Sequence, residues 1–307
     1  MDRKKQIEAD MMILLVTIAW GLSYILTDYS LKDLDTMTLN AHRFLIGGAV
    51  AAIFGIKRLK KVNKVTFLYS LAIGTALTLV YVCVTYGMTR TALANAGFLC
   101  AMTVLFTPLF ARVFLKQKQE LKVIVSVAFS IMGIAFLTLN ENFSINMNHL
   151  TGDLLCLGCG AFYSIDLLLT EKAVERKDVD PFNLGVLNLT VAGIEFLILA
   201  MILETPHLPT NPMFWGSTLF LAVFCTGLAF IIQPIAQQYT TATHIGVIFT
   251  LEPVFNAVAV FIFLKEALSL RSYIGGFIMV LAVLIMEINL KPIFSRIKSQ
   301  DLQKKSQ

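Results

Sequence analysis

Three titratable side chains lie inside long apolar stretches of the sequence, where charge is costly. Asp166 stands near the middle of one stretch, and Glu252 directly precedes Pro253 in another. His244 lies eight residues before Glu252. A carboxylate at the centre of a membrane helix costs roughly 2.5–3.5 kcal/mol unless it is paired, protonated or in contact with water. These positions predict a site that binds an amine or a proton inside a bilayer.

Each of these residues also has a structural interpretation. Asp166 could pair with Arg112, and Glu252 could satisfy the helix that Pro253 interrupts. His244 lies near a helix start, where a hydrated histidine is the plainer reading. Both interpretations stay open for each residue at this point.

Polar and aromatic side chains share helical faces with these three residues. His244, Glu252 and Asn256 follow one another at spacings of eight and four, which is one helical face. The candidate substrate-binding residues are Trp20, Tyr81, Asn95, Tyr163, Asp166, Gln233, His244, Glu252 and Asn256. For the aromatic members, stacking on a substrate competes with simple filling of space. For Arg43 and Glu195 we expect a fixed salt bridge or a gate contact.

Ten apolar stretches, each long enough to cross a bilayer, must position these side chains. No water in the hydrocarbon satisfies free backbone groups, so each stretch is expected to be a helix. The predicted spans are Met11–Thr27, Met37–Ile56, Thr66–Tyr86, Ala92–Leu115, Lys122–Leu139, Thr151–Thr170, Asn183–Leu203, Phe214–Ala236, Thr243–Leu264 and Arg271–Leu290.

The composition agrees with an all-α integral membrane protein. Hydrophobic residues make up 57% of the chain and charged residues 15%, against about 25% charged in soluble domains. The mean hydropathy is +0.74. The net charge of +5 comes from lysines and arginines in short loops and tails, so we expect no nucleic-acid partner.

Lys and Arg are distributed unequally between the two sides of the predicted topology. With the N-terminus inside, most of them fall in the inner segments, and only Lys32, Arg90, Lys265 and Arg271 fall outside. The positive-inside rule then predicts that both termini are cytoplasmic in a multi-pass protein of the cell membrane. We expect no cleaved signal peptide, because the first apolar run continues into a full span.

The sequence shows no catalytic constellation, and we expect neither an enzyme nor a cofactor. The Cys156-x-x-Cys159 pair lies in an apolar helix and has no second pair, so we expect no metal site. Glycine-rich phosphate loops and Ser/His/Asp arrangements are also absent from the sequence.

The two halves of the chain repeat each other. A shift of 149 residues places Thr91, Gly97, Phe106 and Lys116 on Thr240, Gly246, Phe255 and Lys265, and a shift of 143 places Asp10, Leu14, Leu26 and Thr27 on Asp153, Leu157, Leu169 and Thr170. Residues related by either shift are called repeat mates below. We expect a first five-helix repeat at 9–140, a second at 150–291 and a basic cytoplasmic tail at 292–307.

An odd number of helices in each repeat makes the second repeat enter the membrane from the opposite side. The predicted fold is therefore ten helices in two inverted repeats around a central cavity. This architecture is typical of secondary transporters, in which a midplane site opens to either side in turn.

Several residues also resemble one transporter family. The run Thr91–Phe98, the pair Trp20-Gly21, Arg43, the run Leu251–Pro253 and the run Leu264–Glu266 are similar to EamA-type members of the drug/metabolite transporter superfamily. The resemblance spans the chain and implies a ten-helix carrier of small metabolites, often amino acids. The sequence departs from the common pattern at Asp166 and His244, so the resemblance does not transfer a substrate.

These observations predict a secondary transporter of a small amphiphilic metabolite, an amino acid or a derivative, with proton-coupled export as the candidate mode. Its expected partners are the small-molecule substrate and the lipid bilayer, and it is a monomer or a homodimer. A channel, a membrane sensor that does not transport, and a lipid-modifying enzyme are the alternatives. Short loops disfavour the enzyme, and the absence of a carbonyl filter or a ring of like charge disfavours the channel.

Overall fold

The computed structural model describes residues 3–60, 62–91, 96, 99–138, 149–265 and 270–287, and they are almost entirely helical. In chain order the helices are α1 (Arg3–Ser30), α2 (Thr36–Leu59), α3 (Lys64–Met88), α5 (Thr103–Phe114), α6 (Leu121–Thr138), α7 (Leu150–Val174), α8 (Pro181–Leu203), α9 (Pro212–Phe220), η2 (Leu221–Leu228), α10 (Ala229–Gln237), α11 (Ala242–Phe249), α12 (Glu252–Ala259), η3 (Val260–Leu264) and α13 (Leu270–Glu287).

Ten membrane spans account for these elements. Within the described residues, seven helical segments are long and apolar enough to cross a membrane, and two of them join several elements, α9 to α10 and α11 to η3. The three shorter apolar helices are α5, α6 and α13. The predicted all-α fold of ten membrane helices is confirmed.

Helix starts follow local side-chain chemistry. The Asp180 carboxylate accepts a hydrogen bond from the Asn183 amide at 2.8 Å and caps α8, whose first residue is Pro181. Asn63 caps α3 in the same way, through the Thr66 amide at 2.7 Å. These caps satisfy amides that a helix end leaves free, and both helices begin two residues before the predicted spans Asn183–Leu203 and Thr66–Tyr86.

The eighth and ninth spans depart from regular α-helix. The eighth contains the π-helical segment η2, and the ninth breaks between Phe249 and Glu252. The sequence predicted one continuous helix over Thr243–Leu264, and this was wrong in detail. Pro253 has no amide proton, so the turn before it loses a hydrogen bond and a new helix starts at Glu252.

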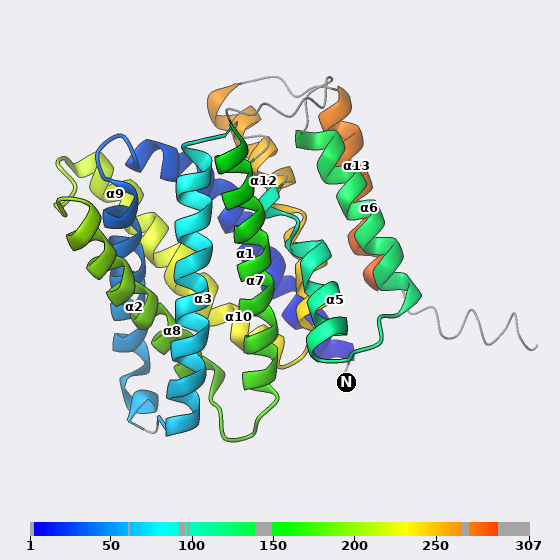
Figure 1. Ribbon diagram of the computed structural model, residues 1–307, viewed down its shortest axis with the longest axis horizontal. Coiled ribbons are helices and arrows are strands. Elements are labelled where there is room, and N and C mark those ends of the chain that lie inside the picture. Colours follow the sequence, from blue (N-terminus) through cyan, green and yellow to red (C-terminus); the bar gives the residue numbers. More distant parts are fainter. Residues whose placement is uncertain are drawn as a thin grey trace, which may run out of the picture.

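The packing of the helices repeats as the sequence does. Helix α3 of the first half packs along α7 of the second half. Their repeat counterparts, α10 for α3 and α1 for α7, also pack together. The second helices of the halves, α2 and α8, contact each other, as do the fifth, α6 and α13, at opposite sides of the bundle (Figure 1). Lys116 and its repeat mate Lys265 both have left-handed backbone conformations, with φ of 54° and 56°. The two halves therefore share backbone detail as well as helix order.

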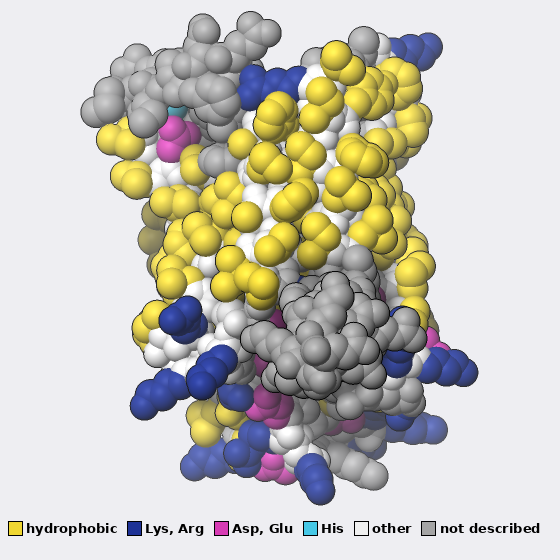
Figure 2. Space-filling model, turned by 90° about the vertical axis from the view of Figure 1, so that its right-hand side faces the viewer, with side chains coloured by type: hydrophobic (Ala, Val, Ile, Leu, Met, Phe, Trp, Pro, Cys, Tyr) yellow, Lys and Arg dark blue, Asp and Glu magenta, His cyan; other side chains and the backbone are white. Residues whose placement is uncertain are grey.

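The surface separates into an apolar belt and charged ends. Hydrophobic side chains cover the middle and upper part of the face in Figure 2, and Lys and Arg gather mainly below them. The first helix begins at this lower end, and α13 runs down to it (Figure 1). An even number of spans places the two ends of the described bundle together in this way.

Gly21 allows α1 and α12 to approach closely. A Cβ added at Gly21 would lie 2.5 Å from the Phe255 Cβ and 2.9 Å from the Asn256 backbone nitrogen. Such distances force the two backbones apart, so small residues are needed at this crossing.

We therefore predict that Gly21→Ala destabilises the protein by roughly 1–3 kcal/mol, the usual cost of overpacking. The measurement is the thermal unfolding midpoint of the purified protein in detergent. Gly216→Ala is the control, because a Cβ there meets nothing within 4 Å. Equal midpoints for the two variants would contradict the close crossing.

Candidate functional site

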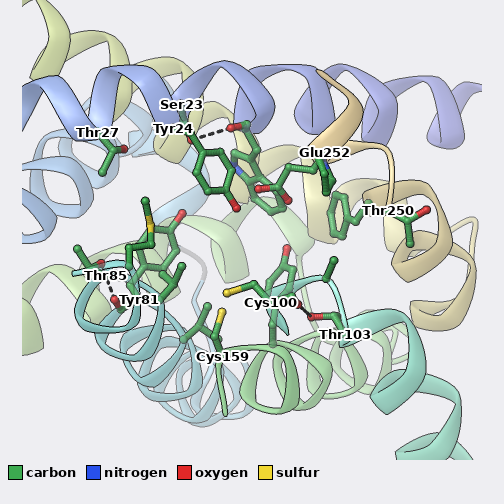
Figure 3. Close-up of a pocket in the computed structure, with 18 of the residues that line it drawn as sticks. Ser23, Tyr24, Thr27, Tyr81, Thr85, Cys100, Thr103, Cys159, Thr250 and Glu252 are labelled. Carbon is green, nitrogen blue, oxygen red and sulfur yellow. Dashed lines mark hydrogen bonds between the residues drawn. The ribbon is translucent and has the colours of Figure 1, made fainter. Parts of the chain in front are cut away.

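A cavity of about 120 Å³ lies at the interface of the two halves. Eight elements contribute side chains to it, namely α1, α2, α3, α5, α7, α10, α11 and α12. The cavity extends to Met88, the last residue of α3. Figure 3 shows its walls, with α1 on one side and α3 and α7 opposite.

The middle of the cavity obeys the repeat symmetry. For five pairs of repeat mates both members line it: Trp20 and Tyr163, Tyr81 and Phe230, Cys100 and Phe249, Ala101 and Thr250, and Thr103 and Glu252. In an inverted-repeat transporter the binding site lies near the midplane, where the two repeats contribute equivalent residues to it. These pairs therefore define the centre of the site.

Aromatic rings close one end of this centre. The Trp20 ring lies 4.8 Å from Phe249, 5.4 Å from Phe230 and 5.8 Å from Tyr163, between ring centroids. The Trp20 Nε1 donates to the Cys225 carbonyl at 2.8 Å. Aromatic pairs at such distances attract each other beyond their burial, and the indole hydrogen bond fixes the central ring. We call these four rings the aromatic floor.

A chain of polar contacts lies directly beneath the aromatic floor. The Tyr163 hydroxyl donates to Gln233 Oε1 at 3.0 Å, and Gln233 Nε2 donates to Asp166 Oδ1 at 3.0 Å. One turn further along, Gln237 Nε2 donates to the Leu167 carbonyl at 2.9 Å.

The same side of α7 makes a third contact, with the start of α11. The Ala242 amide, at the start of α11, donates to Glu171 Oε2 at 2.7 Å. We call Asp166, Leu167, Glu171, Gln233, Gln237 and Ala242 the polar seal, because they join α7 to α10 and α11 beneath the cavity. Within the described residues the Asp166 Oδ2 atom has no hydrogen-bond partner.

The polar seal and the opposite end of the cavity are built from repeat mates. Ser23, Tyr24, Thr27, Val84 and Met88 line the cavity, and their mates are Asp166, Leu167, Thr170, Gln233 and Gln237. These mates are only 0–3% exposed and line no part of it. The facing surfaces of α1 and α3 are thus separated by the cavity at one end of the molecule. The equivalent surfaces of α7 and α10 are joined by hydrogen bonds at the other end.

Two charged side chains line the cavity. Arg43 donates from Nε to Thr226 Oγ1 at 3.1 Å and from Nη1 to Thr27 Oγ1 at 3.5 Å. Its guanidinium carbon also lies 5.1 Å from the centre of the Tyr81 ring. Glu252 comes from α12, with the Tyr24 hydroxyl beside its carboxyl group (Figure 3).

The structure separates the residues that the sequence grouped as a site. Trp20, Tyr81, Tyr163 and Glu252 line the cavity. Asp166 and Gln233 belong to the polar seal, where Asp166 contacts Gln233 and not Arg112. Arg112 is exposed at the end of α5.

Three further candidates lie elsewhere. His244 is 4% exposed, with Nε2 3.4 Å from Asp10 Oδ1, so the hydrated histidine was a wrong expectation. Asn256 lies against α1 near Gly21. Asn95 lies outside the described residues. The helix break before Glu252 is the reason that His244 does not share a helical face with Glu252 and Asn256.

Arg43 was expected to form a salt bridge or a gate contact, and the described residues provide it with no carboxylate partner. Glu195 instead accepts from Thr75 Oγ1 at 2.7 Å. An arginine within a predicted span is the signal in the sequence from which a place at the cavity could have been predicted for Arg43. Among the described residues no group of three or more His, Cys, Asp or Glu side chains is arranged to hold a metal ion.

Comparison with known proteins gives consistent results. The sequence model of the EamA-like transporter family matches residues 7–139 and 150–288, once in each half. An uncharacterized transporter of Methanothermobacter thermautotrophicus is 26% identical over 89% of this chain and 84% of its own. The uncharacterized transporter YvbV of Bacillus subtilis is 24% identical over 90% of each chain.

A solved crystal structure has the same fold. It superposes with a TM-score of 0.78 over 91% of this chain and 96% of that chain, at 16% sequence identity. At this identity the likeness concerns the fold alone.

The position of the five cysteines predicts a labelling pattern. The sulfurs of Cys100 and Cys159 face the cavity (Figure 3), whereas Cys83, Cys156 and Cys225 do not line it. Cys100 is partly exposed and the other four cysteines are buried. We expect a small polar thiol reagent to modify Cys100 and Cys159 in the folded protein, as measured by intact mass. The Cys100→Ser/Cys159→Ser variant should lose this labelling. Modification of Cys225 at the same rate would contradict the cavity.

Proposed function

Because the chain belongs to the EamA-like transporter family of the drug/metabolite transporter superfamily, we propose that it moves a small amphiphilic metabolite by alternating access. The chain is a multi-pass membrane transporter. The proposed substrate is an amino acid or a derivative, and the proposed membrane is the cytoplasmic membrane. The cavity volume is below the roughly 300–1,000 Å³ of drug-sized ligand sites, which favours a small substrate.

The observation that carries alternating access is the unequal state of the repeat mates. Ser23, Tyr24, Val84 and Met88 line the cavity at one end, and their mates are joined in the polar seal at the other. Exchanging the conformations of the two halves would break the polar seal and close the opposite end. The cavity would then be reached from the side of the termini.

The two ends would not close with equal strength. The polar seal joins α7 to α10 and α11 through three hydrogen bonds, at Asp166, Leu167 and Glu171. Their repeat mates Ser23, Tyr24 and Asp28 would face apolar side chains such as Val84 and Met88. A buried hydrogen bond contributes about 0.5–1.5 kcal/mol, so we infer that the state with the seal closed is favoured when no substrate is bound.

Orientation follows from the charges at the ends of the helices. The end that carries the polar seal, the start of α1 and the end of α13 also carries most of the Lys and Arg side chains on the face in Figure 2. We propose that this end is cytoplasmic, in agreement with the positive-inside rule. The described conformation is then open to the outside.

Glu252 is the residue best placed to couple substrate to protons. Its repeat mate Thr103 also lines the cavity, so this central position would face solution in both conformations. An amine and a proton cannot neutralise one carboxylate together. Exclusive binding of the two at Glu252 would couple export of substrate to entry of protons.

Thr27 and Thr170 are repeat mates of the same residue type. Alternating access predicts that cysteines at these two positions react with reagents from opposite sides of the membrane. Thr27 lines the cavity and Thr170 is 1% exposed. In a Cys100→Ser/Cys159→Ser background, Thr27→Cys should react with an impermeant thiol reagent added on the side opposite the termini. Thr170→Cys should react only from the terminus side, and only while substrate turns over.

Turnover should also lower the reactivity of Thr27→Cys. Simultaneous reaction of both variants from one side would indicate a continuous pore and would contradict a carrier.

Coupling at Glu252 predicts a specific change in pH dependence. Among the described residues Glu252 is the only acid that lines the cavity, so transport by Glu252→Gln in proteoliposomes should no longer vary with the proton gradient. Asp166→Asn is the comparison, because Asp166 lies in the polar seal outside the cavity, and this variant should keep the dependence. If both variants keep the full dependence, protons are not coupled at either acid.

A further inference from the structure

We propose that the cavity is a dipolar site for a zwitterion, in which Arg43 binds the carboxylate of the substrate and Glu252 binds its ammonium group. This inference rests on the proposed transport function and specifies the substrate class of the same cavity. It assigns Arg43 to substrate binding, whereas the sequence had predicted a salt bridge or a gate contact.

The first step is the state of Arg43. Its side chain lies in a membrane span and is 3% exposed, and no carboxylate of the described residues lies within 4.0 Å of it. Two threonine hydroxyls and the Tyr81 ring are its partners. A buried charge without a counterion is costly, and a guanidinium has five N–H donors, more than these partners use. The cavity beside it is the place from which an anion would complete its coordination.

The second step is the way Arg43 is held. Thr226 belongs to η2, the π-helical segment, and Thr27 belongs to α1. These hydroxyls bind the guanidinium from two different helices and restrict its orientation. Short π-helical segments occur frequently at functional sites because they redirect side chains from the regular helical path. A planar, fixed guanidinium suits bidentate binding of a carboxylate.

The third step is the position of Glu252. Its carboxyl group lies beside the Tyr24 hydroxyl, on the wall formed by α12 and α1. Thr27 and Tyr81, which contact Arg43, lie towards the left of Figure 3, and Glu252 lies towards the right. No ion pair joins Arg43 and Glu252 in the described structure. The fold therefore keeps two opposite charges apart across one cavity.

The charge balance then selects the ligand. Arg43 and Glu252 together are neutral, and each lacks an oppositely charged side chain within the described residues. A zwitterion supplies both counterions, and the loaded cavity stays neutral inside the low-dielectric membrane. A simple amine would leave Arg43 unpaired, and a simple carboxylic acid would leave Glu252 unpaired. The aromatic floor offers an apolar surface for the rest of the molecule.

The test compares three probes of one skeleton on the purified full-length protein. Leucine carries both charges, 3-methylbutylamine lacks the carboxylate, and 4-methylpentanoate lacks the ammonium group. Phenylalanine, phenethylamine and 3-phenylpropanoate form a second set. Affinity is measured from the ligand-dependent rise of the unfolding temperature. We expect the zwitterion of at least one set to bind ten or more times tighter than either of its partners.

Two substitutions should change this preference in opposite ways. Arg43→Gln should bind the amino acid and the amine with similar affinity. Glu252→Gln should bind the amino acid and the carboxylic acid with similar affinity. Arg43→Lys, which keeps the charge, should retain part of the preference for the amino acid over the amine and also controls for folding. The matched controls are Arg112→Gln and Glu195→Gln, charged residues of the spans that do not line the cavity.

Three results would overturn the proposal. The first is that neither leucine nor phenylalanine binds. The second is that the three probes of each set bind with equal affinity. The third is that Arg43→Gln lowers the affinities for the amino acid, the amine and the carboxylic acid by the same factor. If one of them occurs while the accessibility of Thr27→Cys and Thr170→Cys still alternates, the carrier mechanism stands and only the zwitterion is wrong. If the accessibility does not alternate either, the proposed function fails with it.

Discussion

The absence of water from the hydrocarbon is the constraint on which this structure depends. Every polar group in a span must be paired within the protein or face a hydrated cavity. The lipid-facing surface of the described chain is accordingly apolar, with residues such as Phe54 and Ile202 largely exposed. Asp166, Arg43 and Gln233 are instead buried inside the helix bundle. The interior of the bundle is thus both the polar core of the protein and the location of its cavity.

The inverted repeat gives this interior two equivalent surfaces with different chemistry. At the centre, repeat mates such as Trp20 and Tyr163 keep similar roles on both sides. Away from the centre the chemistry diverges, since Ser23 corresponds to Asp166 and Val84 to Gln233. Symmetry therefore provides the two states of a transporter, and the unequal side chains determine which state the described structure adopts.

Two departures from regular helix bear directly on the cavity. The break before Glu252 separates this acid from His244, which would otherwise share its helical face. The π-helical segment η2 carries both Thr226, a partner of Arg43, and Cys225, whose carbonyl binds Trp20. Irregular backbone in a membrane protein is tolerated where it lines a cavity or is covered by protein, and both segments meet this condition.

The sequence by itself determined the class of fold, the ten spans and the relation between the halves, because bilayer thickness and helical periodicity are read along one chain. It also identified Trp20, Tyr81, Tyr163 and Glu252, which line the cavity. Only the tertiary structure decided that Asp166 and Gln233 seal the cavity from beneath, and that Arg43 faces it without a carboxylate. These assignments depend on which surfaces of different helices meet in one of two conformations. That choice is made by contacts between residues about 70 to 180 positions apart, which periodicity within a single helix does not encode.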